Sequence, residues 1–217
     1  MQINNSNTVF TSRNIAIRKA DEIARRINAT FPRVSSSHVF ACKNIDKFGF
    51  LEFNLREKTR QLRNLKSSKF NNTSSSLQKL RAFLDPIKER KIGNCGESAQ
   101  IAAISAKING INDAQIVSLR TKGGRKLDHA ALYVQNGESP YIIDPWVGSA
   151  DYVPNMLTKY TSEYRNSLDI GEHLKAKDLK FSPYEDDTYS RFLKKEISEE
   201  DKKALTQLYP QLLIKQN

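Results

Sequence analysis

Cys95 is the residue of this chain best suited to covalent chemistry. It lies in the segment Gly93-Asn94-Cys95-Gly96-Glu97, and the Ala/Ile-rich stretch that follows, 97–109, predicts a largely buried helix that Gly110 ends. Unpaired amides at the start of a helix favour the thiolate form of a cysteine, and glycines let a substrate approach the backbone closely. The segment therefore predicts a nucleophilic thiol.

His129 and Asp144 could serve that thiol. Segments 114–120, 129–135 and 141–144 read as strands, separated by Gly123-Gly124 and by Asn136-Gly137, which is a strong hairpin signal. In a hairpin the start of one strand lies beside the end of its partner. We therefore expect an antiparallel sheet in which His129 and Asp144 are cross-strand neighbours.

These three residues have complementary roles in acyl transfer. Cys95 would attack a carbonyl carbon, His129 would take and return the proton, and Asp144 would orient the imidazole and stabilise its cation. The amide of Cys95, with that of a neighbour such as Gly96, could bind the oxyanion, and the Asn94 side chain is a further candidate donor. Trp146 could shield the triad from water.

Each residue also has an ordinary structural explanation. A cysteine beside such a helix is usually a packing residue, a histidine can simply begin a strand, and Asp144-Pro145 can be a turn. Their conjunction favours the triad, because the chain holds only three histidines and two cysteines. His38 and Cys42 form a competing i,i+4 pair, but it lacks a helix-start glycine and an orienting carboxylate, so we expect a structural role for it.

The remaining pattern is mainly helical and predicts an α+β fold. Apolar residues recur at helical spacing over 12–28, 55–66 and 77–87, segment 67–76 reads as a polar loop, and Ser198 begins a helix that Pro210 breaks. Segment 39–55 is ambiguous. We expect a flexible leader at 1–14, followed by one catalytic domain over 15–217. That domain divides into a basic helical part (15–91), a catalytic core (92–150) and a C-terminal helical part (151–217).

Charge is distributed unevenly. Residues 1–91 hold 19 Lys or Arg and 7 Asp or Glu, whereas residues 92–217 hold 16 and 17. A basic surface of this kind could dock an acidic protein target, and the alternative is a non-catalytic binding module for nucleic acid, anionic lipid or an acidic protein. Nucleic-acid binding is not expected, because the sequence carries no motif for it.

Several other classes are not expected. No apolar run is long enough to cross a bilayer, no Cys/His cluster has metal-ligand spacing, and two cysteines do not suggest a disulfide framework. We therefore expect no cofactor, no metal and a reducing compartment. Residues 1–14 lack the pattern of a cleaved signal peptide, but their Ser/Thr/Asn-rich composition is also found in leaders of bacterial injection systems, so this leader could be a secretion signal.

The motifs Gly93-Asn94-Cys95-Gly96-Glu97, Asp128-His129-Ala130 and 141–145 together resemble the papain-like and transglutaminase-like superfamily. Within it, the segment 92–148 is most similar to papain-like bacterial toxin and effector domains, among them the glutamine deamidase domain of the Pasteurella multocida toxin. The resemblance implies a cysteine-bearing helix packed on an antiparallel sheet that carries His129 and Asp144, with Cys95 completing the triad. It covers about a quarter of the chain.

The resemblance implies an injected effector that deamidates a glutamine of a host protein in the host cytoplasm. The alternative activity is that of a papain-like protease or a transglutaminase, and the alternative location is the cytoplasm of the cell that makes the protein. One family feature is missing, because no glutamine precedes Cys95 where papain supplies an oxyanion donor; residues 88–91 are Lys, Glu, Arg and Lys. Arylamine acetyltransferases share the order of the triad, but they are larger and have an arginine-rich segment before the cysteine.

Overall fold

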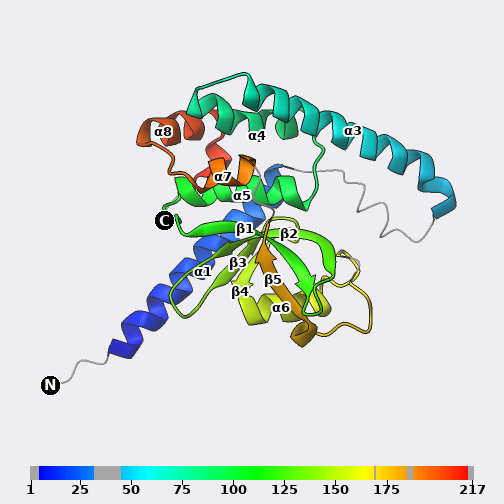
Figure 1. The fold of residues 1–217 in the computed structure, drawn as a ribbon. Helices are drawn as coiled ribbons and strands as arrows, with labels where there is room; N and C mark the ends of the chain where they lie inside the picture. The colour runs from blue at the N-terminus through cyan, green and yellow to red at the C-terminus, as the bar shows by residue number, and fades with distance from the viewer. Residues whose placement is uncertain (1–4, 32–44, 169, 185–187, 215–217) are drawn as a thin grey trace.

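The protein is described here from a computed structural model, which covers residues 5–31, 45–168, 170–184 and 188–214. Its centre is a five-stranded antiparallel sheet in the order β4-β3-β2-β1-β5 (Figure 1). The strands are β1 (Ala114–Thr121), β2 (Lys126–Val134), β3 (Tyr141–Asp144), β4 (Ser149–Tyr152) and β5 (Leu179–Pro183). The helices are α1 (Asn5–Thr30), α3 (Ile45–Asn71), α4 (Ser76–Arg90), α5 (Cys95–Ile108), α6 (Val153–Thr161), α7 (Thr188–Lys194) and α8 (Glu199–Leu208), with short 3-10 turns at Ala176–Asp178 and Pro210–Leu212. The predicted α+β class is confirmed.

Helices cover both faces of the sheet, and a hydrophobic core lies on each. Figure 1 shows α5 between the sheet and the α4 layer, and α6 on the opposite side. Side chains of β2 alternate between these cores: Ala130 and Leu132 join the core shared with α1, α4 and α5, whereas Leu127 and Ala131 join the core shared with α6. The sheet is therefore buried on both faces.

Helix α5 matches the helix predicted after Cys95. Every residue from Glu97 to Lys107 is buried, since the helix lies between the sheet and other helices. At its start, the carboxylate of Glu97 accepts a hydrogen bond from the Asn94 amide at 3.0 Å, which is half of a capping box. Beyond its end, Gly110 has a φ of 79°, which lets the chain turn toward β1.

The predicted hairpin is also present, with different strand bounds. Strand β2 begins at Lys126, three residues before His129, so that His129 lies inside the strand and does not begin it. Strands β2 and β3 pair in antiparallel register, and Gly137 in their connection has a φ of 53°, as the Asn-Gly signal requires.

Several other predicted bounds differ from those of the structure. Helix α1 begins at Asn5 and not at Ser12, so residues 5–14, expected to be a flexible leader, have helical backbone; nothing in that stretch is a glycine or proline that would stop the helix. The expected polar loop at 67–76 is helical up to Asn71. The sheet continues beyond the segment 92–150 expected to form the catalytic core, because β4 reaches Tyr152 and β5 (Leu179–Pro183) lies in the part expected to be helical.

None of the described helices is both long and apolar enough to span a membrane. The competing pair His38 and Cys42 lies outside the described residues. Of the ambiguous segment 39–55, the part from Ile45 onward belongs to α3.

Candidate active site

Cys95 is the first residue of α5, and its side chain is partly exposed. Its Sγ lies 3.9 Å from the carbonyl oxygen of Asp128, the residue before His129. The amides of Cys95 and Gly96 belong to the first turn of the helix, where no intrahelical acceptor is available to them. The thiol therefore stands at the positive end of a helix, next to strand β2.

His129 and Asp144 meet through their side chains. His129 Nε2 lies 2.6 Å from Asp144 Oδ2, and both side chains are almost completely buried. The β2–β3 register pairs Leu132 with Ile143, so one further step sets Asp144 beside Ala131, not His129. The two residues are therefore diagonal neighbours on one face of the sheet, and the longer histidine side chain spans the offset.

Asp144 accepts two further hydrogen bonds. The Trp146 amide donates to Oδ1 at 2.9 Å, and the Tyr160 hydroxyl donates to Oδ2 at 2.6 Å. Burial and the Asp144 carboxylate raise the pKa of Tyr160 well above its usual value, so the phenol remains a donor. The Tyr160 ring also packs edge-on against His129, with ring centroids 5.3 Å apart.

The electrostatics of this cluster favour a charged imidazole. Burial by itself would lower the pKa of His129, but the charge and hydrogen bond of Asp144, with a smaller contribution from Cys95, raise it to about 10. Because Nε2 faces Asp144, Nδ1 is the nitrogen left to exchange a proton with Cys95. Nδ1 is buried and makes no hydrogen bond of ordinary geometry among the described residues, although Cys95 is near enough to act on the ring.

A second charged cluster fixes the start of α5. The buried carboxylate of Glu97 pairs with Arg63 Nε at 3.0 Å and lies 3.8 Å from Lys66 Nζ. Lys66 itself is buried and donates to Gln100 at 2.9 Å. Burial would raise the pKa of Glu97, but the charges of Lys66 and Arg63 and the hydrogen bonds from Arg63 and the Asn94 amide lower it. Helix α3 is thus tied to the turn that carries Cys95.

Helix α1 supports the other half of the site. The Asn28 side-chain amide donates to the carbonyl oxygens of Pro145 and Trp146, at 2.8 and 3.1 Å. These contacts hold the turn that follows Asp144. Gly148, with a φ of 68°, completes that turn, and a Cβ there would stand 3.4 Å from Asn28.

The three secondary candidates lie close to the triad residues. Trp146 is buried in the core that the sheet shares with α6, and its backbone amide donates to Asp144. Asn94 precedes Cys95, and its side-chain oxygen is buried without a hydrogen-bond partner among the described residues. Gly96 is half-buried, and the hydroxyl of Tyr184 lies 3.7 Å from the position a Cβ would take there.

The supporting residues Tyr160, Arg63 and Asn28 have no sequence signal that reveals them. Tyr160 belongs to a short amphipathic helix in which a tyrosine is an ordinary core residue. The Asn94 to Glu97 spacing indicates a capping box, but it does not predict ion pairs with a helix thirty residues away.

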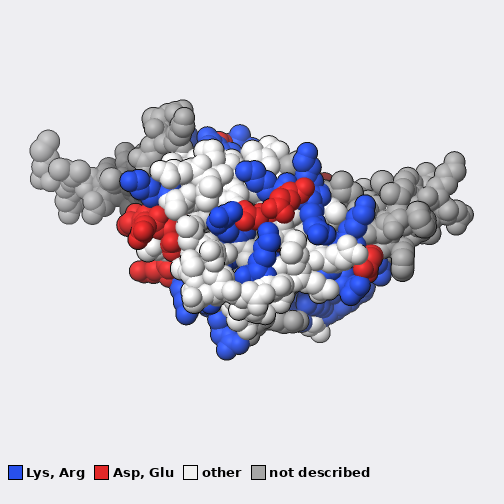
Figure 2. Space-filling view, turned by 90° about the horizontal axis from the view of Figure 1, so that it is seen from above, with Lys and Arg blue, Asp and Glu red and all other residues white. Residues whose placement is uncertain are grey.

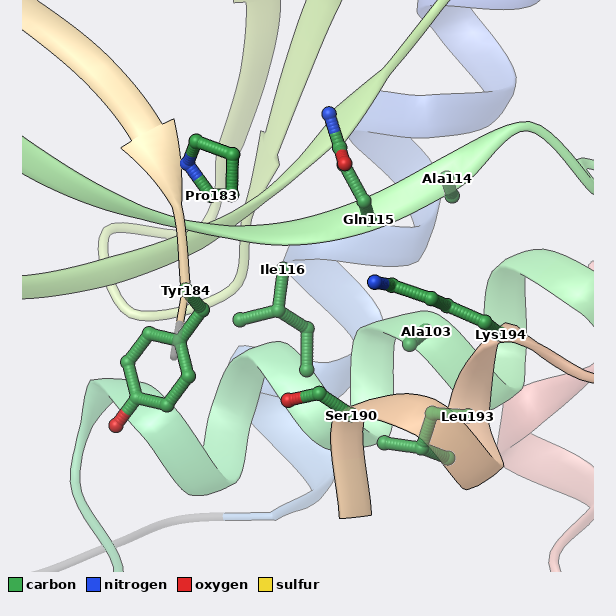
Figure 3. A pocket seen from close by; sticks show the side chains of 9 residues that line it. All are labelled: Ala103, Ala114, Gln115, Ile116, Pro183, Tyr184, Ser190, Leu193 and Lys194. Atoms are coloured by element: carbon green, nitrogen blue, oxygen red, sulfur yellow. The ribbon is translucent and has the colours of Figure 1, made fainter. Parts of the chain in front are cut away.

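Two pockets flank the start of α5. One, of about 360 Å³, is lined by residues of α3 and α5, among them Arg63 and Gly96, and by Tyr184, which follows β5. The other, of about 420 Å³, is lined by Arg56, Thr59, Arg60, Arg63, Asn64 and Asn94. A third pocket, shown in Figure 3 between α5, β1 and α7, holds only about 20 Å³ and contacts α5 at Ala103, two turns beyond Cys95. That space suits a water molecule and no substrate.

Within the described residues, no three His, Cys, Asp or Glu side chains are grouped so that they could hold a metal ion. Comparison of the chain with family models, with curated protein sequences and with solved structures finds no match in any of the three.

Proposed function

We propose that the chain is a cysteine-dependent acyl-transfer enzyme that converts a glutamine of a host protein into glutamate. The observation that supports acyl transfer best is the hydrogen bond between His129 Nε2 and Asp144 at 2.6 Å, which leaves a buried Nδ1 beside the thiol of Cys95. An imidazole held in this way can accept a proton and keep it, because the carboxylate stabilises the cation.

The reaction would run in two halves. Cys95 Sγ attacks the side-chain amide carbon of glutamine, and the oxyanion is stabilised by the free amides of the first turn of α5. His129 gives its Nδ1 proton to the amide nitrogen, ammonia leaves, and a thioester remains. Water then gives a proton to His129 and its oxygen attacks the thioester carbon. The carbon–sulfur bond breaks and restores the thiolate–imidazolium pair, and the glutamic acid side chain that is released passes its proton to the ammonia in solvent to become glutamate.

The choice of glutamine as the substrate rests on the resemblance of 92–148 to papain-like toxin and effector deamidase domains. The net positive charge of the molecule, +11, agrees with an acidic protein as the target. Lys and Arg side chains spread widely over the face shown in Figure 2, whereas Asp and Glu side chains form small separate groups on it. Such a surface attracts acidic proteins. We place the reaction in the cytoplasm of a host cell, after injection by a specialised bacterial secretion system.

Host-cell lysate provides the test. The protein and its Cys95→Ala variant are incubated with lysate, and peptides are searched by mass spectrometry for glutamine-to-glutamate conversions. We expect conversions confined to one or a few proteins that disappear with Cys95→Ala. New chain termini that depend on Cys95 would indicate proteolysis instead of deamidation, and new glutamine–amine crosslinks would indicate a transglutaminase.

A further inference from the structure

One face of α3 forms a wall beside Cys95. Arg56, Arg60 and Arg63 recur at helical spacing and line the 420 Å³ pocket together with Asn94, the residue before the cysteine. Arg63 also lines the 360 Å³ pocket that reaches Gly96 on the other side of Cys95. The two pockets are therefore neighbours along the start of α5, one at the residue before Cys95 and the other at the residue after it.

The wall is positively charged. Among the described residues, those that line the 420 Å³ pocket include three arginines and no carboxylate. Burial lowers the pKa of Arg63, but the charge and hydrogen bond of Glu97, with smaller contributions from Tyr184 and Cys95, outweigh this effect and raise it. A negative charge brought into this pocket would therefore be attracted to the arginines, next to the residue that precedes Cys95.

Two of the three guanidiniums of this wall already bind carboxylates of the chain itself. Arg60 binds the carboxylate of Glu57 through two nitrogens, at 2.8 and 2.7 Å, and Arg63 binds that of Glu97. The Arg60–Glu57 pair joins two side chains of the same exposed helix face, with 66% and 36% of their areas accessible. Exposed pairs of this kind are weak, so an incoming carboxylate can displace Glu57.

We propose that the pocket between α3 and Asn94 receives a carboxylate side chain of the substrate protein, an Asp or Glu next to the glutamine in the site. This inference rests on the proposed function and specifies its substrate: a glutamine with acidic residues on the side that lies along α3. Arg56 and Arg60 bind the carboxylate, while Arg63 stays paired with Glu97 and adds its charge.

Alkylation of Cys95 tests the pocket without knowledge of the substrate. Iodoacetate and iodoacetamide form the same sulfur–carbon bond and release the same iodide, and they differ in carrying or lacking a carboxylate. The ratio of their rates is measured by mass spectrometry on the tryptic peptide 92–107, first in the folded full-length protein and then in urea. We expect the folded ratio to exceed the unfolded one by about tenfold and to fall as salt is added.

Charge variants separate the pocket from the imidazolium of His129, which also attracts iodoacetate. Arg56→Gln and Arg60→Gln should each lower the ratio by about threefold, and Glu57→Gln should raise it by a similar factor because it releases Arg60. Lys58→Gln is the matched control. Lys58 is exposed on the same helix and lines neither pocket. Its replacement removes the same charge, so the ratio of iodoacetate to iodoacetamide rates should stay at the wild-type value.

The outcomes distinguish this inference from the proposed function. If iodoacetamide reacts faster with folded than with unfolded Cys95, but the two arginine variants keep the wild-type ratio, the carboxylate pocket is wrong and the nucleophile stands. If folded Cys95 reacts with iodoacetamide no faster than unfolded Cys95, the proposed nucleophile fails and the pocket inference fails with it.

Discussion

Tyr160 and His129 share one carboxylate oxygen: the phenol donates to Asp144 Oδ2 at 2.6 Å, the same atom that lies 2.6 Å from His129 Nε2. A buried carboxylate needs such donors to remain charged. The Tyr160 ring also packs against the imidazole. We therefore expect Tyr160 to be a positioning residue, which acts on the imidazole through Asp144.

Replacement Tyr160→Phe keeps the ring and removes the donor. We expect the plateau of the rate of Cys95 alkylation by iodoacetamide to fall by about tenfold, because the carboxylate is held less firmly. We also expect the alkaline limb of the pH–rate profile to move to higher pH, because the O–H dipole of Tyr160 no longer offsets part of the negative potential of Asp144 at His129. A lower rate with an unchanged profile would reduce Tyr160 to a packing residue.

The pair of His129 and Asp144 should make stability depend on pH. The folded pKa of His129 is raised to about 10 from the usual 6.5. The stabilisation that this shift represents is complete below pH 6.5 and is lost as pH rises through about 10. Urea unfolding of the wild type should show this decline across that window, and Asp144→Asn should remove it. Parallel curves for the two proteins would contradict the coupling.

Glu97 should show the opposite dependence. Its folded pKa is lowered, so its contribution is present above the usual value of 4.5 and is lost as pH falls through the folded value. Near pH 7, Glu97→Gln should lower the free energy of unfolding by about 2–4 kcal/mol, because it leaves the buried Lys66 without its carboxylate. In acid the difference from wild type should shrink.

Denaturant unfolding of Glu97→Gln and the wild type at pH 7 and pH 4 measures the loss in unfolding free energy and its decrease in acid. The matched control is Glu89→Gln, whose pair with Lys69 at 3.9 Å is exposed on both sides. Its cost should stay below about 0.5 kcal/mol at either pH. An equal cost for both variants would mean that the Glu97 cluster is no stronger than a surface pair.

Asn28 should link α1 to activity. Asn28→Ala removes the donor to Pro145 and Trp146 and leaves their carbonyl oxygens without it. We expect a loss of about 1–2 kcal/mol in unfolding free energy, together with slower alkylation of Cys95, because the Trp146 amide no longer fixes Asp144 firmly. Asn71→Ala, which removes an exposed contact to Ser67, should change neither quantity.

Local signals in the sequence predict the part of the site that depends on local structure. The Cys95 helix follows from its Ala/Ile composition and Gly110, and the β2–β3 hairpin follows from Asn136-Gly137. Both are in the structure. Together these signals predict that His129 and Asp144 lie near each other. They do not predict the diagonal offset between the two residues, because the turn signal leaves the strand register open.

The remainder depends on contacts between distant segments. Strands β4 and β5 lie at the two edges of the sheet and are short, so most of what makes them strands is pairing with β3 and β1. Tyr160 and Asn28 are ordinary residues of amphipathic helices until the fold brings them to Asp144. No periodicity in the sequence carries that information.

The order of the sheet has one more consequence. His129 lies on β2, the middle of five strands, whereas Cys95 lies at the end of a helix. Fraying of β4 or β5 leaves both neighbours of β2 in place, so the β2 amides should exchange with solvent only when the whole domain opens. His129, the proposed base, thus lies on the strand whose amides should exchange most slowly, and Cys95, the proposed nucleophile, lies in a first helical turn whose amides should exchange early.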